Sequence, residues 1–216
     1  MKKIILGLGI CSFLAGCSNF KEGVSYLALG DSYTIGESVE TNSNFPYQLA
    51  DSLSRDGKEY ISPVIIARTG WRADELIEAV ESANLKKEYD LVTLLIGVNN
   101  EFQGKSIEEY EKEFTILCKK SVELAANRKE RVYVLSIPDY GYTSFGEANL
   151  ERISTRIDQF NAVNKRISDS LELNYIDITG ISRKGFRQTG LIAEDGLHPS
   201  SKMYGLWVKE ILKRRK

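Results

Sequence analysis

The most informative run for the architecture of this chain is Leu91-Val92-Thr93-Leu94-Leu95-Ile96, which is apolar at every position except Thr93. A strand with one face in water alternates apolar and polar residues, whereas a strand covered on both faces is apolar almost throughout. The run therefore predicts a buried strand in a sheet that carries helices on both faces.

Shorter apolar runs and longer amphipathic segments alternate on either side of this strand. Because strands that alternate with helices form parallel sheets, the pattern predicts one α/β domain, and about five strands are too few for an eight-stranded barrel. The expected fold is a three-layer α/β/α sandwich with a doubly wound, mainly parallel sheet of about five strands. Strands are expected over 24–29, 61–67, 91–96, 132–137 and 175–178, and helices over 45–55, 71–83, 107–127, 148–171 and from Pro199 to about 213.

Composition narrows the class of protein further. The chain has 216 residues, 42% of them hydrophobic and 27% charged, with a net charge of -1. These values are ordinary for a single globular domain, and no basic region of the kind that binds nucleic acid is present in the sequence. No nucleic-acid partner is expected, and no sequence feature predicts an oligomeric state.

The first residues read as a targeting signal. A positively charged start and an apolar run over 4–15 end in Leu14-Ala15-Gly16-Cys17, which resembles the bacterial lipobox. We therefore expect a lipoprotein-type signal peptide over 1–16, a polar tether over 17–23 and the folded domain over 24–216. Cys17 would carry the lipid, of the palmitate type, and would hold the exported protein at a membrane of the bacterial cell envelope. The alternative is an ordinary secretory signal followed by a chance cysteine.

The chain contains one histidine, His198, within Asp195-Gly196-Leu197-His198-Pro199. A serine hydroxyl is a weak nucleophile until a base removes its proton, and Ser32 lies in a glycine-flanked turn after the first expected strand. His198 can act as that base when it is neutral, and Asp195 can hold its tautomer. The sequence thus predicts a catalytic triad in the chain order Ser32, Asp195, His198, with activity that falls in acid.

Polar turns follow the first three expected strands: Gly30-Asp31-Ser32, Arg68-Thr69-Gly70 and Gly97-Val98-Asn99-Asn100. The carboxyl ends of parallel strands share one edge of the sheet, so these turns should lie together. Candidate donors to an oxyanion are the backbone N–H groups of Ser32 and Gly70 and the side-chain amide of Asn99. Each of these motifs alone could have a purely structural role, as a turn or a helix cap. The occurrence of all of them together favours an acyl-transfer site.

These motifs resemble those of the SGNH, or GDSL, hydrolases. Gly30-Asp31-Ser32 with Gly36 matches the first block, Gly70 the second, Gly97-Val98-Asn99 the third, and Asp195 to Pro199 the last. The resemblance implies a flavodoxin-like α/β/α fold and ester hydrolysis without a metal. The sequence departs from the pattern at Asn100, where the third block usually has an aspartate, and at Tyr33, where leucine is common in the first block. The role of that aspartate is interpreted as positional, so Asn100 puts the local hydrogen bonding in question and not the reaction.

The predicted function is that of a lipid-anchored serine esterase. It would cleave a lipid or short acyl ester, or an O-acetylated carbohydrate, through an acyl-Ser32 intermediate. No cofactor is expected, and one histidine without a cysteine cluster cannot build the usual zinc site. The alternative is a non-catalytic envelope lipoprotein that binds a glycan or a lipid at the same edge of the sheet.

Two aromatic features leave their roles open. The segment 139–146 is rich in aromatic residues and glycine and follows the fourth expected strand. It could form the wall or lid of a pocket, or its rings could simply pack on the domain. Trp71, next to Gly70, could line a pocket or pack at the start of the following helix.

Overall fold

The structure, a computed structural model, describes residues 23–55, 62–86 and 88–215. Its centre is a five-stranded sheet in the order β2-β1-β3-β4-β5, and all neighbouring strands are parallel. In register, Leu27 of β1 lies opposite Val64 of β2 on one side and Val92 of β3 on the other. The strands are β1 (Tyr26–Gly30), β2 (Val64–Ala67), β3 (Leu91–Leu95), β4 (Val132–Leu135) and β5 (Asn174–Ile176).

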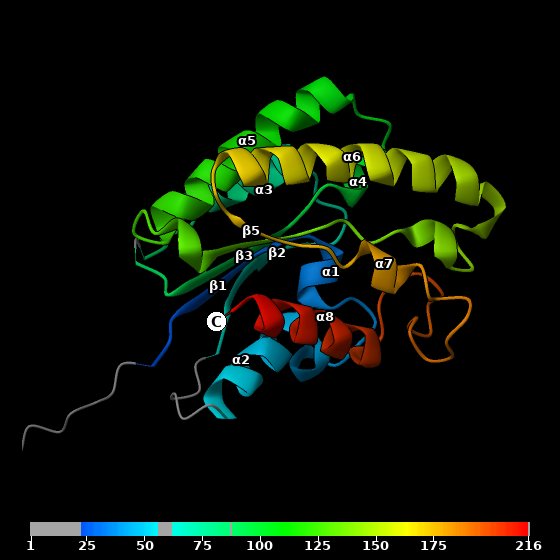
Figure 1. The fold of residues 1–216 in the computed structure, drawn as a ribbon, viewed down its shortest axis with the longest axis horizontal. Helices are drawn as coiled ribbons and strands as arrows, with labels where there is room; N and C mark the ends of the chain where they lie inside the picture. Colours follow the sequence, from blue (N-terminus) through cyan, green and yellow to red (C-terminus); the bar gives the residue numbers. More distant parts are fainter. Residues whose placement is uncertain (1–22, 56–61, 87, 216) are drawn as a thin grey trace, which may run out of the picture.

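Helices cover both faces of the sheet, as Figure 1 shows. On one face α5 (Ile107–Leu124) packs between α3 (Ala73–Ser82) and α6 (Leu150–Ser170). On the other face α2 (Phe45–Arg55) packs against α8 (Ser201–Arg214). Short helices stand at the ends of strands or loops: α1 (Ser32–Ile35), α4 (Val98–Phe102) and α7 (Thr179–Ser182).

The predicted fold class is confirmed. The strand order is that of the flavodoxin-like doubly wound sheets, in which the direction of winding reverses between β1 and β3. All five residues of β1 and of β3 are buried, as expected for strands covered on both faces. Beneath the sheet, Phe45 of α2 and Tyr204 and Trp207 of α8 form an aromatic cluster, with ring centroids 5.0 Å apart for the two residues of α8.

The last helix begins later than the sequence predicted. Pro199 was expected in its first turn, but α8 starts at Ser201 and Ser200 is its N-cap. The Ser200 hydroxyl accepts a hydrogen bond from the backbone N–H of Met203 at 3.2 Å, which satisfies one of the free amides at the start of the helix. Pro199 consequently lies before the helix, next to the cap.

Cys118 lies on the buried face of α5, and its burial raises the pKa of the thiol. The expected signal peptide over 1–16 and residues 17–22 of the expected tether lie outside the described residues, as does the start of the second expected strand. No helix within the described ranges combines the length and the apolar character needed to cross a bilayer.

Candidate active site

Ser32 lies at the carboxyl end of β1, as the first residue of α1. Asp31 is the N-cap of this helix, and its Oδ1 accepts a hydrogen bond from the backbone N–H of Tyr33 at 3.0 Å. A side chain at Gly30 would bring its Cβ to 2.1 Å from the Thr34 hydroxyl, so only glycine lets the chain turn from β1 into α1 here. This tight turn holds Ser32 at the carboxyl end of β1, where it is 5% exposed.

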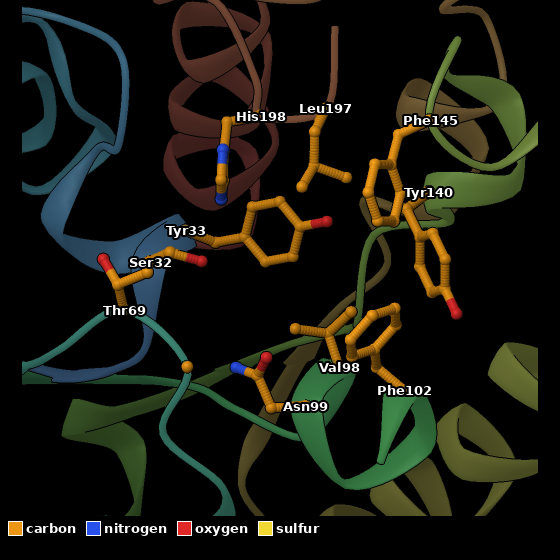
Figure 2. Close-up of a pocket in the computed structure, with 11 residues that line it drawn as sticks. Ser32, Tyr33, Thr69, Val98, Asn99, Phe102, Tyr140, Phe145, Leu197 and His198 are labelled. Atoms are coloured by element: carbon orange, nitrogen blue, oxygen red, sulfur yellow. The ribbon is translucent and has the colours of Figure 1, made fainter. Parts of the chain in front are cut away.

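Asp195 and His198 form the second part of the site. The Oδ1 atom of Asp195 accepts hydrogen bonds from the backbone N–H groups of Leu197 at 2.9 Å and His198 at 3.0 Å. Its Oδ2 atom lies 2.5 Å from Nδ1 of His198 and accepts a hydrogen bond from the Ser38 hydroxyl at 2.6 Å. Because Asp195 occupies Nδ1, Nε2 is the ring nitrogen left for another partner. Figure 2 shows the His198 ring directed toward Ser32 and Tyr33.

The two aspartates of these turns differ in their acidity. Partial burial opposes ionisation of Asp195, but the hydrogen bonds from Ser38 and His198 outweigh it and hold the pKa of Asp195 well below its usual range. Complete burial of Asp31 raises its pKa to about 7, although the backbone N–H of Tyr33 favours the ionised form. Asp195 is therefore the carboxylate that carries a charge beside the imidazole at neutral pH.

Gly70 and Asn99 come from the turns after β2 and β3. Gly70 has a φ of +85°, in the left-handed region that favours glycine. Asn99 lies on α4, and its Nδ2 donates one hydrogen bond to the backbone carbonyl of Trp71 at 2.9 Å. An amide nitrogen has two hydrogens, so this bond orients the group and leaves one N–H for a ligand. Trp71 serves the site through its backbone, while its ring packs against the hydrophobic core.

These turns surround a cavity of about 170 Å³ at the carboxyl edge of the sheet (Figure 2). One part, which we call the polar half, is lined by Ser32, Thr69, Gly70, Asn99 and His198. The other part, the apolar half, is lined by Val98, Phe102, Tyr140, Phe145 and Leu197. The Tyr33 ring lies between the two halves, as Figure 2 shows. The cavity thus offers a reactive end and an apolar end.

Hydrogen bonds fix the aromatic wall of the apolar half. The Tyr140 hydroxyl donates to Oε2 of Glu101 at 2.7 Å, and Glu101 is buried, with Arg152 3.5 Å from its other oxygen. Asp139 accepts a hydrogen bond from the backbone N–H of Gly141 at 2.9 Å, which shapes the turn that carries Tyr140. Of the two roles left open for segment 139–146, the structure supports the pocket wall for Tyr140 and Phe145.

Asn100 has a structural role, as interpreted from the third motif, and the structure identifies its partners. Its Oδ1 accepts a hydrogen bond from the backbone N–H of Ala73, the first residue of α3, at 2.9 Å. Its Nδ2 donates to Oε2 of Glu113 on α5 at 3.1 Å. An aspartate could accept the first bond but could not donate the second, so the amide suits a neighbour that is itself a carboxylate.

The structure brings the predicted site residues to one edge of the sheet. The same cavity is lined by Ser32, Gly70, Asn99 and His198, and Asp195 is hydrogen-bonded to Nδ1 of His198. Sequence reasoning missed Ser38, which reaches Asp195 across 157 positions of the chain and belongs to no local pattern. It also missed Phe102, whose only signal is its place three residues after Asn99 on the same helix. No group of three or more His, Cys, Asp or Glu side chains in the described part of the chain is placed to hold a metal ion.

The fold and the site together indicate a class of protein. A doubly wound α/β domain with a serine and a histidine at the carboxyl edge of its sheet is the arrangement of serine hydrolases. Residues 28–206 match the model of the GDSL-like Lipase/Acylhydrolase family. The chain belongs to this family and is an ester-hydrolysing enzyme. The family that the motifs resemble is thus confirmed as the family of this chain.

Solved structures with the same fold include several esterases. A lipolytic protein of the G-D-S-L family from Veillonella parvula DSM 2008 is 16% identical over 88% of this chain and 97% of its own, with a TM-score of 0.68. An acetylxylan esterase from Geobacillus stearothermophilus is 18% identical over 90% of this chain and 95% of its own, with a TM-score of 0.69. The esterase EstA from Pseudoalteromonas sp., solved as a complex inhibited by monoethylphosphonate, is 19% identical over 88% of this chain and 96% of its own, with a TM-score of 0.62. No curated protein matches the sequence at a significant level.

Proposed function

We propose that the protein hydrolyses carboxylic esters of small acyl groups through an acyl-enzyme formed on Ser32. The observation that carries the proposal is the cavity in which Ser32 and His198 meet, with Nδ1 of His198 held 2.5 Å from Asp195. This hydrogen bond leaves Nε2 of the imidazole to take the serine proton.

In the first step Ser32 Oγ attacks the ester carbonyl carbon while Nε2 of His198 accepts the hydroxyl proton. Asp195 keeps the proton on Nδ1 and stabilises the imidazolium that forms. The carbonyl oxygen becomes an oxyanion, for which the backbone N–H groups of Ser32 and Gly70 and the remaining Nδ2–H of Asn99 are the donors. The N–H of Ser32 is the first amide of α1 and so has no partner within its own helix.

The tetrahedral intermediate then collapses and its bond to the alcohol oxygen breaks. His198 returns the proton to the leaving oxygen, so that a neutral alcohol departs and the acyl group stays on Ser32. A water molecule repeats the attack with His198 as base, and the proton passes to Ser32 Oγ as the carboxylic acid leaves. The cycle consumes one ester and one water and restores the enzyme.

The size of the cavity supports a small acyl group. Its volume of about 170 Å³ is below the roughly 300–1,000 Å³ of pockets that enclose drug-sized ligands. The apolar half would receive the acyl chain, because the polar half contains the groups that act on the carbonyl. Short acyl esters of lipid-like, aryl or sugar alcohols fit this division, and the fold shared with an acetylxylan esterase makes an O-acetylated carbohydrate one candidate.

The test is turnover of p-nitrophenyl acetate by wild type, Ser32→Ala and His198→Ala. Both variants should lose at least about 1,000-fold in kcat, and Phe186→Ala, which removes an exposed ring outside the cavity lining, should keep the wild-type rate. An alkyl phosphonate should label wild type but not Ser32→Ala.

Unchanged turnover in both active-site variants would refute the proposal, and ligand binding without turnover would favour the non-catalytic alternative. Acetylated xylan and aryl esters of increasing chain length would then define the substrate.

We also propose that the protein is exported and anchored through a lipid on Cys17. Two features support this: the motif Leu14-Ala15-Gly16-Cys17, and the place of Val24 before β1, at the edge of the sheet opposite Ser32. A tether that reaches the domain at Val24 would leave the cavity free. Cys17→Ala should move the protein from the membrane to the soluble fraction, whereas Cys118→Ala, which changes a thiol inside the domain, should not. Membrane association that persists without Cys17 would exclude the anchor.

A further inference from the structure

We infer that Tyr33 sets the length of acyl chain that the enzyme accepts, because its ring separates the apolar half of the cavity from a second, inner cavity. The inference rests on the proposed function and assigns to one side chain the limit on the substrate. It makes Tyr33 a specificity-determining residue, next in sequence to Ser32.

The inner cavity lies directly behind the wall of the first. It has a volume of about 10 Å³, and Tyr33, Tyr140 and Leu197 line it as well as the outer cavity. These three side chains are therefore the partition between the two spaces. The rest of the inner lining is Pro138, Asp139, Thr143, Ser182, Ile192, Pro199 and Met203.

Within the partition, two aromatic contacts hold Tyr33 in place. Its ring is 3% exposed and lies edge to face with His198, at 5.6 Å between centroids, and with Trp207, at 6.4 Å. Two such neighbours restrict rotation of the ring, so the partition is rigid. Figure 2 shows the ring in the middle of the cavity, with its hydroxyl directed toward the apolar half. An acyl chain on Ser32 that extends inward would meet this ring.

The other two members of the partition have structural roles that restrict their variation. Tyr140 is bonded to the buried carboxylate of Glu101 at 2.7 Å. Leu197 belongs to the turn whose backbone N–H groups hold Asp195. Shortening Tyr33 is thus the change that opens the partition with the least effect on these contacts.

The inner cavity, at about 10 Å³, holds no more than about one water molecule, so an alkyl chain could enter it only with the space that shortening Tyr33 opens. Its polar groups would not oppose such a chain, because they already have partners. Asp139 accepts hydrogen bonds from the Ser154 hydroxyl at 2.7 Å and from Nε of Arg183 at 2.9 Å. The Ser182 hydroxyl donates to Thr179 at 2.7 Å, and the Thr143 hydroxyl donates to the carbonyl of Tyr140 at 2.6 Å. An entering chain would leave no polar group newly unpaired, and it would pack against the prolines, Ile192 and Met203.

The experiment compares kcat/KM for p-nitrophenyl acetate, butyrate, hexanoate and octanoate among wild type, Tyr33→Phe and Tyr33→Leu. Wild type should favour the two shorter esters. Tyr33→Leu, which removes the outer part of the ring, should raise the ratio of hexanoate to acetate by about tenfold or more, the scale of discrimination that one methylene gives in an apolar pocket. Tyr33→Phe, which keeps the ring and loses the hydroxyl, should keep the wild-type ratio, as should Phe186→Ala.

The ratio between chain lengths separates this inference from the proposed function. Misplacement of His198 would lower the rates for all esters together, whereas an opened partition changes their order. If Tyr33→Leu does not fold, Tyr33→Met, which retains more of the buried apolar volume, takes its place with the same expected rise. An unchanged ratio in a folded variant, an equal rise in Tyr33→Phe, or a wild type that prefers octanoate would overturn the inference while Ser32-dependent turnover remained intact.

Discussion

Two aspartates stand next to the reacting groups, and they begin with the same local geometry. Asp31 precedes Ser32 and Asp195 lies three residues before His198. In each, Oδ1 accepts the backbone N–H of the residue two positions further on, Tyr33 at 3.0 Å and Leu197 at 2.9 Å. The second oxygen differs: Oδ2 of Asp195 is bonded to Ser38 and His198, whereas Oδ2 of Asp31 is buried and has no hydrogen-bond partner among the described residues.

Of the two carboxylates, Asp195 is the one bonded to the imidazole, and the difference at the second oxygen also separates their pKa values. Burial, with no hydrogen-bond partner for Oδ2 among the described residues, raises the pKa of Asp31 to about 7. The hydrogen bonds to Asp195 outweigh its partial burial and lower its pKa. Distance from the nucleophile along the chain is a poor guide to the role of a carboxylate. The number of donors that reach its second oxygen is a better one.

The largest expected effect comes from Asp195→Asn. The variant keeps the shape of the side chain but cannot hold the imidazole in the correct tautomer or stabilise the imidazolium, so kcat should fall by about 10,000-fold. Steady-state turnover of a short aryl ester measures the loss. Asp31→Asn should cost far less in kcat, and equal losses in the two variants would contradict the contrast between the two carboxylates.

Asp31→Asn should change stability in a way that depends on pH. Folded Asp31 keeps its proton up to about pH 7, whereas in the unfolded chain an aspartate loses it near about pH 4. Between these values the folded protein binds more protons, so the contribution of Asp31 to stability falls as pH rises and levels off above about pH 7. The free energy of unfolding of Asp31→Asn should therefore rise, relative to that of wild type, by a few kcal/mol between pH 4 and pH 7.

Urea unfolding of both proteins across this pH range tests the prediction. Asp195→Asn is the opposing control, because the pKa of Asp195 is lowered on folding. Its contribution to stability is present above about pH 4 and is lost as pH falls through the folded pKa. Parallel pH profiles for wild type and Asp31→Asn would show that the buried carboxyl ionises as it does in water.

Asn100→Asp would create a further carboxylate in a buried place, beside Glu113. Asn100 is 1% exposed, and its Nδ2 lies 3.1 Å from Oε2 of Glu113. The substitution removes the donor and sets two carboxylates face to face, which should lower the free energy of unfolding at pH 7 by about 1–3 kcal/mol. Asn100→Asp combined with Glu113→Gln restores a donor and should recover most of the loss. A double variant no more stable than Asn100→Asp would disprove the pairing.

The smallest expected effect belongs to Ser38→Ala. It removes one of the two donors to Oδ2 of Asp195, at 2.6 Å, and leaves the bond to His198 in place. A hydrogen bond to a charged group contributes about 1.5–3 kcal/mol to stability. Because the bond from His198 and two backbone bonds still hold Asp195, only part of this should appear in catalysis, and kcat/KM should fall by no more than about tenfold. Ser38 has a φ of +63°, where a β-branched residue is strained, so the matched control is Ser38→Gly, which also lacks the hydroxyl and should lose about as much. A loss as large as that of Asp195→Asn would mean that Ser38 does more than orient the carboxylate.

Much of the fold followed from periodicity along the chain. The helix expected over 45–55 has those bounds in α2, and the five expected strands all occur, each of them shorter than predicted. The one-turn helices α1 and α4 were not predicted, because four or five residues are too few to show a helical period. Pro199 was misplaced because a proline before a helix and a proline in its first turn give the same signal, and only the bond to the Ser200 hydroxyl distinguishes them.

The sequence by itself determined the order of strands and helices and the residue types in the turns, because hydrophobic periodicity and turn chemistry are local properties. From those turns and the rule for parallel strands, it also located Ser32, Gly70 and Asn99 at one edge of the sheet. Only the tertiary structure decided which carboxylate contacts the imidazole and which rings, Tyr33 among them, line the cavity. These outcomes depend on burial and on contacts between side chains far apart in the sequence, such as Ser38 with Asp195, for which the chain carries no local signal.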